Sequence, residues 1–241
     1  MRLPVPRSSA WWAAAGVGIL GVGYLTLATA AWARFGHARR SHPDEADDLL
    51  DRFIPSYETV ERHQVRVAAP AAITLHVAKN ASLNESRLVR GIFRARALAL
   101  GADSQDTTSE RGLLEQMTAM GWRVLADIPE REVVVGAVTQ PWMPNVVFRG
   151  IDPDAFRTFD EPGYVKIVWT LRVDPIGETA CIFRTETRVV ATDAEARRKF
   201  RWYWARFSPG IAVIRRAMVQ SVKHHTERAI PATASGLEAE P

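Results

Sequence analysis

One histidine and two threonines are the polar residues best placed to do chemistry inside a folded domain. Residues 60–67 alternate in polarity, the period of a half-buried strand, and His63 shares a face with Val65 and Val67. An inward histidine could act as an acid, a base or a ligand contact. The alternative is a core histidine whose ring is bonded to a backbone carbonyl.

The two threonines belong to a second alternating run, residues 179–190. One face of this strand carries Cys181, Phe183, Thr185, Thr187 and Val189. Thr185 and Thr187 would place hydroxyl groups in an otherwise apolar interior, where sparse polar groups orient a bound ligand. Threonine is also simply a good strand former. The opposite face carries Arg184, Glu186 and Arg188, which we expect to form an exterior charge ladder of little energetic value.

Aromatic side chains supply the remaining candidates for a pocket wall. Residues 164–173 alternate again and turn Trp169 inward, and Trp142 lies in a proline-bearing connection over residues 139–163. Such a long connection in a compact domain is often a functional rim. Both tryptophans could line a pocket, although aromatic residues at such positions also serve as plain core.

Other reaction centres have little support. Glu130 and Glu132 resemble a carboxylate pair, but beside Pro129 in a turn they are expected to be solvated. The six histidines are not spaced as metal ligands, and the lone Cys181 excludes an intrachain disulfide. No nucleophile elbow, phosphate loop or Cys-His pair occurs. We therefore expect no metal and no cofactor, assign no catalytic residue, and leave open whether the protein is an enzyme.

A long helix must cover the strands that position these residues. Thr192 and Glu195 form a capping box that opens the helix. Beyond it, apolar residues at steps of three and four form one stripe: Phe200, Trp204, Phe207, Ile211, Ile214, Met218 and Val222. Pro209 interrupts the helix and predicts a kink or two abutting helices, because proline removes one backbone hydrogen bond.

Residues 10–33 carry no charge and have the length of a membrane span. We expect an uncleaved transmembrane anchor, with a cleaved signal peptide as the competing interpretation. The arginines after this segment slightly outnumber those before it, which favours a single-pass protein of the cell membrane with a cytoplasmic soluble domain. Gly16, Gly18 and Gly21 spell a dinucleotide fingerprint, but no strand precedes them, so the match carries no meaning.

The expected organisation has five parts. Residues 1–9 form a stub, 10–33 the anchor, 34–54 a linker, 55–228 the folded domain and 229–241 a disordered tail. Within the domain, the order is a strand, two or three helices, a run of antiparallel strands and the long helix. This order predicts an α+β fold in which a sheet curls around a helix.

Several local strings resemble an uncharacterised bacterial branch of the SRPBCC superfamily, the START-related helix-grip proteins. The strings are Glu61-Arg62-His63 leading to Ala69-Pro70, Thr185-Glu186-Thr187-Arg188-Val189, Phe200 to Trp204, Pro209-Gly210 and Ile214-Arg215-Arg216. The resemblance implies a helix-grip fold, a curved antiparallel sheet wrapped around a long C-terminal helix. It also implies a cavity for an apolar or amphipathic molecule, and it brings no catalytic residues.

Three functions follow as hypotheses. The first is a membrane-anchored domain that binds an apolar or amphipathic small molecule or lipid. The second is an enzyme similar to the superfamily's cyclases and dehydratases, and the third a scaffold without a cavity. The expected ligand-binding residues are His63, Trp142, Trp169, Phe183, Thr185, Thr187, Trp204, Phe207 and Ile211. The sequence has a pI near 9.6, but no recognised nucleic-acid module occurs and we expect no such partner. The ligand and the oligomeric state stay open.

Overall fold

A six-stranded antiparallel sheet forms the centre of the protein in a computed structural model, which describes residues 22–39, 42–43, 46–81, 87–101 and 112–234. The strand order is β1-β6-β5-β3-β2, and β4 pairs with β3. The strands are β1 (Thr59–Val67), β2 (Arg123–Ile128), β3 (Glu132–Thr139), β4 (Phe148–Arg149), β5 (Val165–Pro175) and β6 (Cys181–Ala191).

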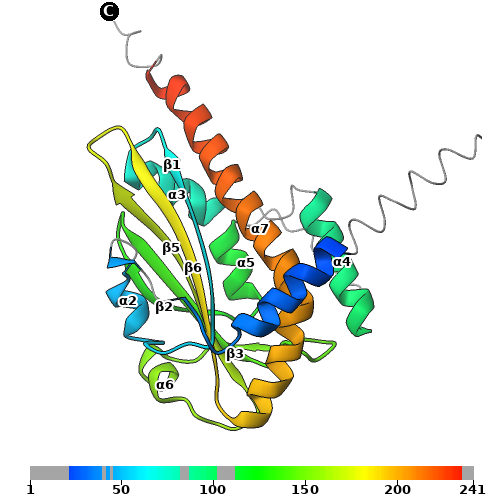
Figure 1. Ribbon diagram of the computed structural model, residues 1–241. Coiled ribbons are helices and arrows are strands. Elements are labelled where there is room, and N and C mark those ends of the chain that lie inside the picture. Colours follow the sequence, from blue (N-terminus) through cyan, green and yellow to red (C-terminus); the bar gives the residue numbers. More distant parts are fainter. Residues whose placement is uncertain (1–21, 40–41, 44–45, 82–86, 102–111, 235–241) are drawn as a thin grey trace, which may run out of the picture.

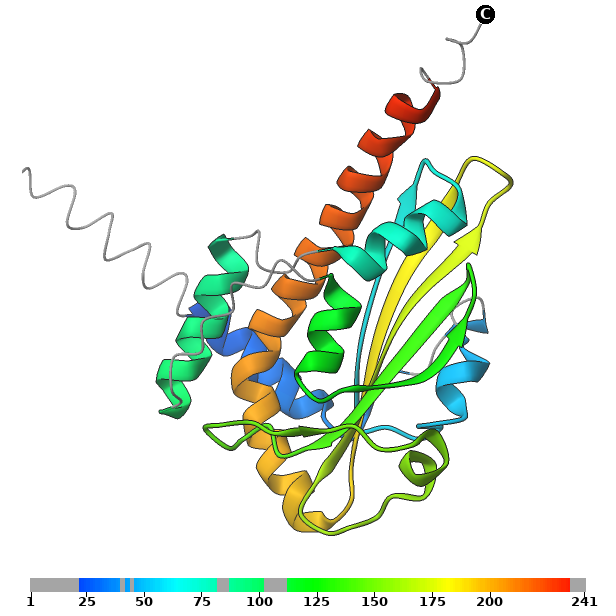
Figure 2. The ribbon, with the colours of Figure 1, turned by 180° about the vertical axis from the view of Figure 1, so that it is seen from behind.

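Helices cover both faces of this sheet (Figure 1). They are a helix over residues 22–34, called here the N-terminal helix, and α2 (Asp48–Asp51), α3 (Ala71–Asn80), α4 (Arg87–Leu100), α5 (Leu113–Ala119), α6 (Pro153–Thr158) and α7 (Ala194–Ala234). We call the face that α3, α5 and α7 cover the inner face, and the face that α2 and α6 cover the outer face (Figures 1 and 2).

The expected long C-terminal helix is confirmed as α7, which crosses the inner face as one continuous helix and runs past residue 228 to Ala234. Its predicted cap was wrong. The Asp193 carboxylate accepts hydrogen bonds from the backbone N–H groups of Glu195 and Ala196, at 2.7 and 2.9 Å. Thr192 instead bonds to the backbone of Tyr164. Pro209 does not divide the helix.

The segment expected to be a linker, residues 34–54, contributes to the core. Asp47 caps α2 by accepting hydrogen bonds from the N–H groups of Leu49 and Leu50. The short helix buries its leucines, together with Ile54, against the outer face of the sheet. The acidic residues of this predicted linker therefore alternate with apolar residues. Burial of each apolar side chain stabilises the fold by about 1.5–3 kcal/mol.

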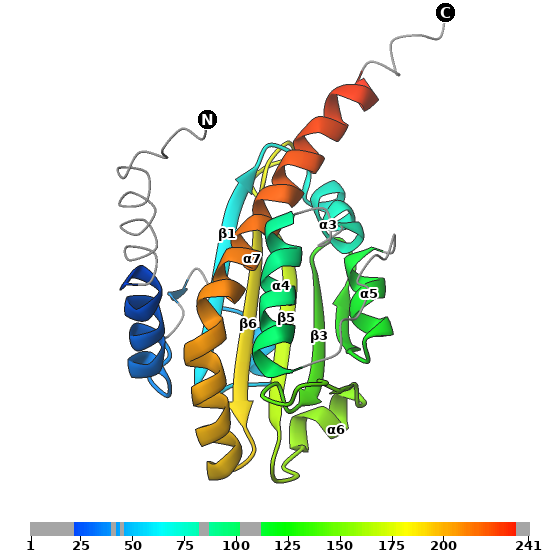
Figure 3. The same ribbon diagram turned by 90° about the vertical axis from the view of Figure 1, so that its right-hand side faces the viewer.

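The first half of the predicted membrane span, residues 10–21, lies outside the described residues, as do the stub 1–9 and the tail from 235. No helix within the described ranges is long and apolar enough to cross a membrane. What the structure does show is where the end of that segment docks. The rings of Trp32 and Trp202 lie 4.5 Å apart, and Arg201 donates to the Trp32 carbonyl at 3.0 Å. The N-terminal helix thus lies beside α7 (Figure 3).

Candidate functional site

The inner face of the sheet places two rows of residues side by side under α7. In the first row Trp169 pairs with Thr187, and Thr187 pairs with Glu61. In the second row Thr185 pairs with His63. Side chains directly opposite each other on one face of a sheet lie about 5 Å apart at Cβ, so these rows form one compact group on β5, β6 and β1.

Arg215 joins this group from α7. Its guanidinium carbon lies 4.1 Å from the centre of the Trp169 ring. Arg215 is four residues after Ile211 and three before Met218, so the helix turns it toward the sheet. Burial lowers the pKa of Arg215 to about 10, against the opposing charge of Glu61. The guanidinium therefore stays protonated at neutral pH, although no carboxylate of the described residues lies within ion-pair distance of it.

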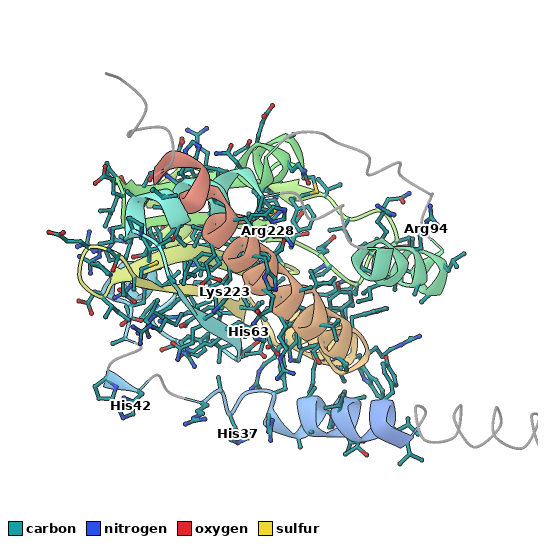
Figure 4. All side chains as sticks on the ribbon, turned by 90° about the horizontal axis from the view of Figure 1, so that it is seen from above. His37, His42, His63, Arg94, Lys223 and Arg228 are labelled. Atoms are coloured by element: carbon teal, nitrogen blue, oxygen red, sulfur yellow. The ribbon has the colours of Figure 1, made fainter. Side chains whose placement is uncertain are left out.

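Two further polar atoms in this group have no hydrogen-bond partner among the described residues: Thr187 Oγ1 and His63 Nε2. The His63 ring nitrogen lies 3.4 Å from Glu61 Oε2, within ion-pair distance but not aligned as a hydrogen bond. Thr185, in contrast, accepts a hydrogen bond from the Trp169 indole N–H. We call the set the inner-face polar site: Glu61, His63, Trp169, Thr185, Thr187 and Arg215. Figure 4 shows His63 on β1 alongside α7.

The predicted site residues divide into two groups in the structure. His63, Trp169, Thr185 and Thr187 belong to the polar site, and Phe183 is fully buried in the adjacent core. The others pack in a separate aromatic cluster around the first turns of α7 or beside it: Trp142, Trp204, Phe207 and Ile211. Sequence reasoning missed Glu61 and Arg215. The available signals were the period of β1 for Glu61 and the i+4 step from Ile211 for Arg215.

The inner side of the sheet is closely packed. A narrow void beside the polar site has no room for a water molecule and is lined by Leu113, Leu114, Val133, Val135, Trp169 and Leu171. An open depression of about 440 Å³ lies at the end of the sheet where α3 begins, between Ala72 and Arg131. Neither of these two spaces is an enclosed cavity of the size that the fold led us to expect.

A second polar group lies on the outer face, where two predictions were wrong. Glu132 is not solvated but 2% exposed, and its oxygen accepts a hydrogen bond from the Thr170 hydroxyl at 2.8 Å. Burial, and a hydrogen bond with the Asp47 carboxyl, raise the pKa of Glu132 to about 8. Arg172 lies close to Asp47, at 3.7 Å, and partly offsets the charge of this acid pair.

The expected exterior ladder is likewise covered. Arg188 is 1% exposed and donates to Glu186 at 2.6 Å, to the carbonyl of Ile54 at 3.0 Å, and to Asp51. Arg62 donates to the second oxygen of Glu186 at 2.7 Å. Residues 46–58 cover this strand face, and the short amphipathic α2 in that segment is what sequence reasoning overlooked. We call this set the outer-face charge network: Asp47, Asp51, Arg62, Glu132, Thr170, Arg172, Glu186 and Arg188.

The parts of the chain that the structure describes contain no set of side chains that could bind a metal ion. No group of three or more His, Cys, Asp or Glu side chains there could hold a metal ion. Cys181 is buried, and burial raises the pKa of its thiol. Its sulfur contacts the Thr74 hydroxyl at 3.3 Å, so it is an unreactive core residue.

Comparisons with known proteins give only distant likenesses. No protein-family model and no curated protein matches the sequence. Among solved structures, the Zhui aromatase/cyclase from Streptomyces sp. R1128 is 15% identical, with 71% of this chain and 94% of that chain covered and a TM-score of 0.28. Norcoclaurine synthase from Thalictrum flavum is 13% identical, with 69% and 94% covered and a TM-score of 0.34. A conserved protein from Geobacillus kaustophilus is 11% identical, with 70% and 96% covered and a TM-score of 0.31.

At such low TM-scores these likenesses carry no argument, so the fold assignment rests on the chain's own topology. A first strand is followed by helices, then by antiparallel strands, and finally by a helix that runs across the inner face of the sheet. The last strand, β6, pairs with both the first strand and β5. In strand order and in the placement of α7, the chain has the helix-grip architecture of the superfamily that its sequence resembles.

Proposed function

We propose that the protein binds an amphipathic small molecule in the inner-face polar site, and that the ligand's polar end is an anionic oxygen group such as a carboxylate. One observation carries this proposal: the protonated guanidinium of Arg215 lies over the Trp169 ring without a carboxylate partner among the described residues, and the strand neighbour of Trp169 is Thr187, whose hydroxyl has no hydrogen-bond partner there. Polar groups in a finished protein interior are nearly always hydrogen-bonded. A bound oxygen anion would satisfy both donors.

The apolar part of the ligand would enter beside the site, where the packed side chains around Trp169 leave no room for a water molecule and must move apart. Trp169 forms one wall of the closed void and also stacks against Arg215. Arg215 is only partly buried and its side chain is long and flexible. A rotation of Arg215 away from the Trp169 ring would uncover the face of that ring. Ligand binding therefore requires the side chains around Trp169 to move, and we infer that Arg215 is the first to do so.

The test compares two neighbouring arginines. The full chain is purified in detergent and examined by native mass spectrometry with dodecanoic acid or dodecanol as the probe. Hydrogen bonds to charged groups contribute about 1.5–3 kcal/mol, so the acid should bind at least tenfold more tightly than the alcohol. Arg215→Met should remove this preference. Arg216→Met, in the exposed neighbour, is the matched control and should keep it. Equal binding of the acid to wild type and Arg215→Met would reject the proposal.

A second candidate is catalysis of a dehydration or cyclisation, and the pairing of Glu61 with His63 favours it. A carboxylate beside an imidazole orients the ring, as a general base requires. His63 would remove a proton from the carbon next to a carbonyl and pass it to the β-hydroxyl, which leaves as water while the carbon–carbon double bond forms. Wild type should convert a β-hydroxyacyl thioester to the conjugated enoyl product, and His63→Gln should not. Absence of turnover by wild type would set this candidate aside.

The third candidate, a scaffold, is favoured by the closed interior. It predicts that no apolar molecule is extracted from the purified protein and that neither dodecanoic acid nor dodecanol binds. A discrete extracted molecule would exclude it.

We also propose that residues 10–33 anchor the chain in the cell membrane, with the folded domain on the cytoplasmic side. The support is the uncharged length of this segment and the arginines that follow it. Protease treatment of intact and permeabilised cells is the test. The folded domain should be cleaved only after permeabilisation.

A further inference from the structure

Three helices share one face of the molecule and carry no acidic residue over a long stretch. The N-terminal helix and α4 contain no Asp or Glu, and α7 contains none from residue 196 to residue 226. The N-terminal helix and α4 lie on either side of α7, away from the sheet (Figure 3). We call their outward sides the helical face. Every acidic residue of these three helices lies near an end of α7.

The outward stripe of α7 alternates cations with apolar side chains. Residues spaced by four, four, seven and three positions are exposed: Arg198, Trp202, Arg206, Val213 and Arg216. Trp202 is 61% exposed although it is a large aromatic residue. This stripe lies opposite the one that packs on the sheet, so the exposure follows from the helical period.

The two flanking helices also expose apolar and cationic side chains. On the N-terminal helix, Val22, Leu25 and Leu27 are all more than half exposed. On α4, Leu98 is 83% exposed one turn from the exposed Arg94. Figure 4 shows Arg94 on α4, on the side of the view where the N-terminal helix begins.

Specific contacts join the three helices into one surface. Arg96 of α4 donates to the Tyr203 hydroxyl at 3.2 Å, and a side chain at Gly210 would collide with Ile92. On the other side of α7, Trp32 stacks between Trp202 and Arg201, whose guanidinium lies 4.1 Å from the Trp32 ring. The Tyr24 hydroxyl donates to the Arg206 carbonyl. The helical face is therefore a fixed surface with a fixed arrangement of charges.

We propose that the helical face docks on an anionic phospholipid bilayer. Arginines attract anionic headgroups, exposed Leu and Val side chains enter the acyl boundary, and Trp rings favour the headgroup level. Charge complementarity selects this partner, because the face presents cations without interspersed carboxylates. Docking rests on the anchoring proposed above: residues 10–21 of the anchor would enter the bilayer, while residues 22–33 stay packed along α7 as part of the helical face and fix the orientation of the domain. The inner-face polar site then lies one helix layer from the lipid.

The test measures depth at defined residues of the full chain in lipid nanodiscs. Cys181 is buried, so a nitroxide can be attached selectively at an introduced cysteine. The labelled variants are Leu98→Cys and Trp202→Cys, with Ile176→Cys in the exposed β5–β6 turn as the control far from the helical face. Discs of phosphatidylcholine with phosphatidylglycerol should immerse the first two labels and leave the third aqueous. Discs of phosphatidylcholine alone should immerse them less.

Charge reversal provides the second measurement. Arg94→Glu and Arg206→Glu should each lower the docked population about fivefold on anionic discs, since one well-placed basic side chain supplies about that factor. Arg52→Glu, an exposed arginine at the end of α2, should have no effect.

The outcomes separate docking from anchoring. A chain that fails to elute with the discs contradicts the anchor. A chain that elutes with them while the labels at 98 and 202 stay as aqueous as the label at 176 contradicts docking and leaves the anchor intact. Spin–spin coupling between labels at residue 202 without lipid would identify the face as a contact between copies of this chain, and would also overturn the proposal.

Discussion

The two faces of the sheet treat their polar residues in opposite ways. On the outer face, Arg188 is almost fully buried, yet its donors meet Glu186, Asp51 and a backbone carbonyl. On the inner face, Arg215 has an aromatic ring for a neighbour and no carboxylate within ion-pair distance among the described residues. The outer network is complete within the chain, whereas the inner site is not.

This difference separates a structural role from a binding role. A network in which every charge has a partner holds one segment to another, and here it holds residues 46–58 to the sheet. A site with unpartnered donors costs folding free energy. Proteins accept such a cost where function requires it, so the same residue type, arginine, has different expected mutational effects on the two faces.

Arg188→Met should show the largest effect. Removing one partner of a buried ion pair leaves the other uncompensated, and such changes cost about 3–5 kcal/mol of the free energy of unfolding. Urea denaturation followed by circular dichroism is the measurement. Arg52→Met, at an exposed arginine of the same segment, is the control and should change stability little. A loss at position 188 as small as at position 52 would show that the outer network contributes nothing.

Glu132→Gln should change the pH dependence of stability. Because the folded-state pKa of Glu132 is raised from 4.5 to about 8, the folded protein binds a proton that the unfolded chain has lost between these values. Stability from this group is therefore complete below pH 4.5 and is lost as pH rises through 8. Asp47, Arg172 and Thr170 are the groups that face this carboxyl.

Wild type should therefore lose stability on the order of 2–3 kcal/mol between pH 5 and pH 9. Glu132→Gln should flatten this decline, since an amide can still donate to Asp47 but cannot ionise. Thermal unfolding at a series of pH values is the measurement. The exposed Glu130, two residues away, provides the control Glu130→Gln, which should retain the wild-type profile. Identical profiles of stability against pH for wild type and Glu132→Gln would contradict a proton held between Glu132 and Asp47.

Arg215→Met should change the free energy of unfolding by less than about 1 kcal/mol, or increase it, because a charge without a partner is replaced by an apolar chain of similar length. This is the same substitution as Arg188→Met with the opposite expected result. Urea denaturation of the two variants side by side is the direct test. A loss of several kcal/mol at position 215 would show that the inner site is also a structural network.

Periodicity was sufficient to predict most of the scaffold. Alternation located β1, β5 and β6, and the apolar stripe located α7, because each pattern reflects burial of one continuous face. The four-residue helix α2 and the six-residue α6 are too short to show a period. Their absence from the prediction made the outer face look solvated, which is why the burial of Glu132 and Arg188 was missed.

The candidate site was predicted only in part, for a different reason. His63, Thr185 and Thr187 follow from strand alternation alone. Arg215 was not predicted as a site residue, although its spacing from Ile211 turns it toward the sheet. Spacing separates Arg215 from the exposed Arg216, but the contact of Arg215 with the Trp169 ring depends on how α7 lies over the sheet, which the sequence does not give.

The two threonines of β6 give the finest test of the comparison. Thr187→Val removes a hydroxyl without a partner and should stabilise the protein by about 0.5–1 kcal/mol. Thr185→Val removes the acceptor of the Trp169 indole N–H and should destabilise it by about 1 kcal/mol. Both substitutions replace threonine by valine, a side chain of nearly the same shape, on the same strand face. Differences in packing therefore contribute little to the comparison. If Thr187 binds the ligand's polar end, the variant that gains stability should also bind dodecanoic acid more weakly. If Thr187→Val is more stable but binds dodecanoic acid as tightly as wild type does, the carboxylate is recognised by Arg215 and not by Thr187.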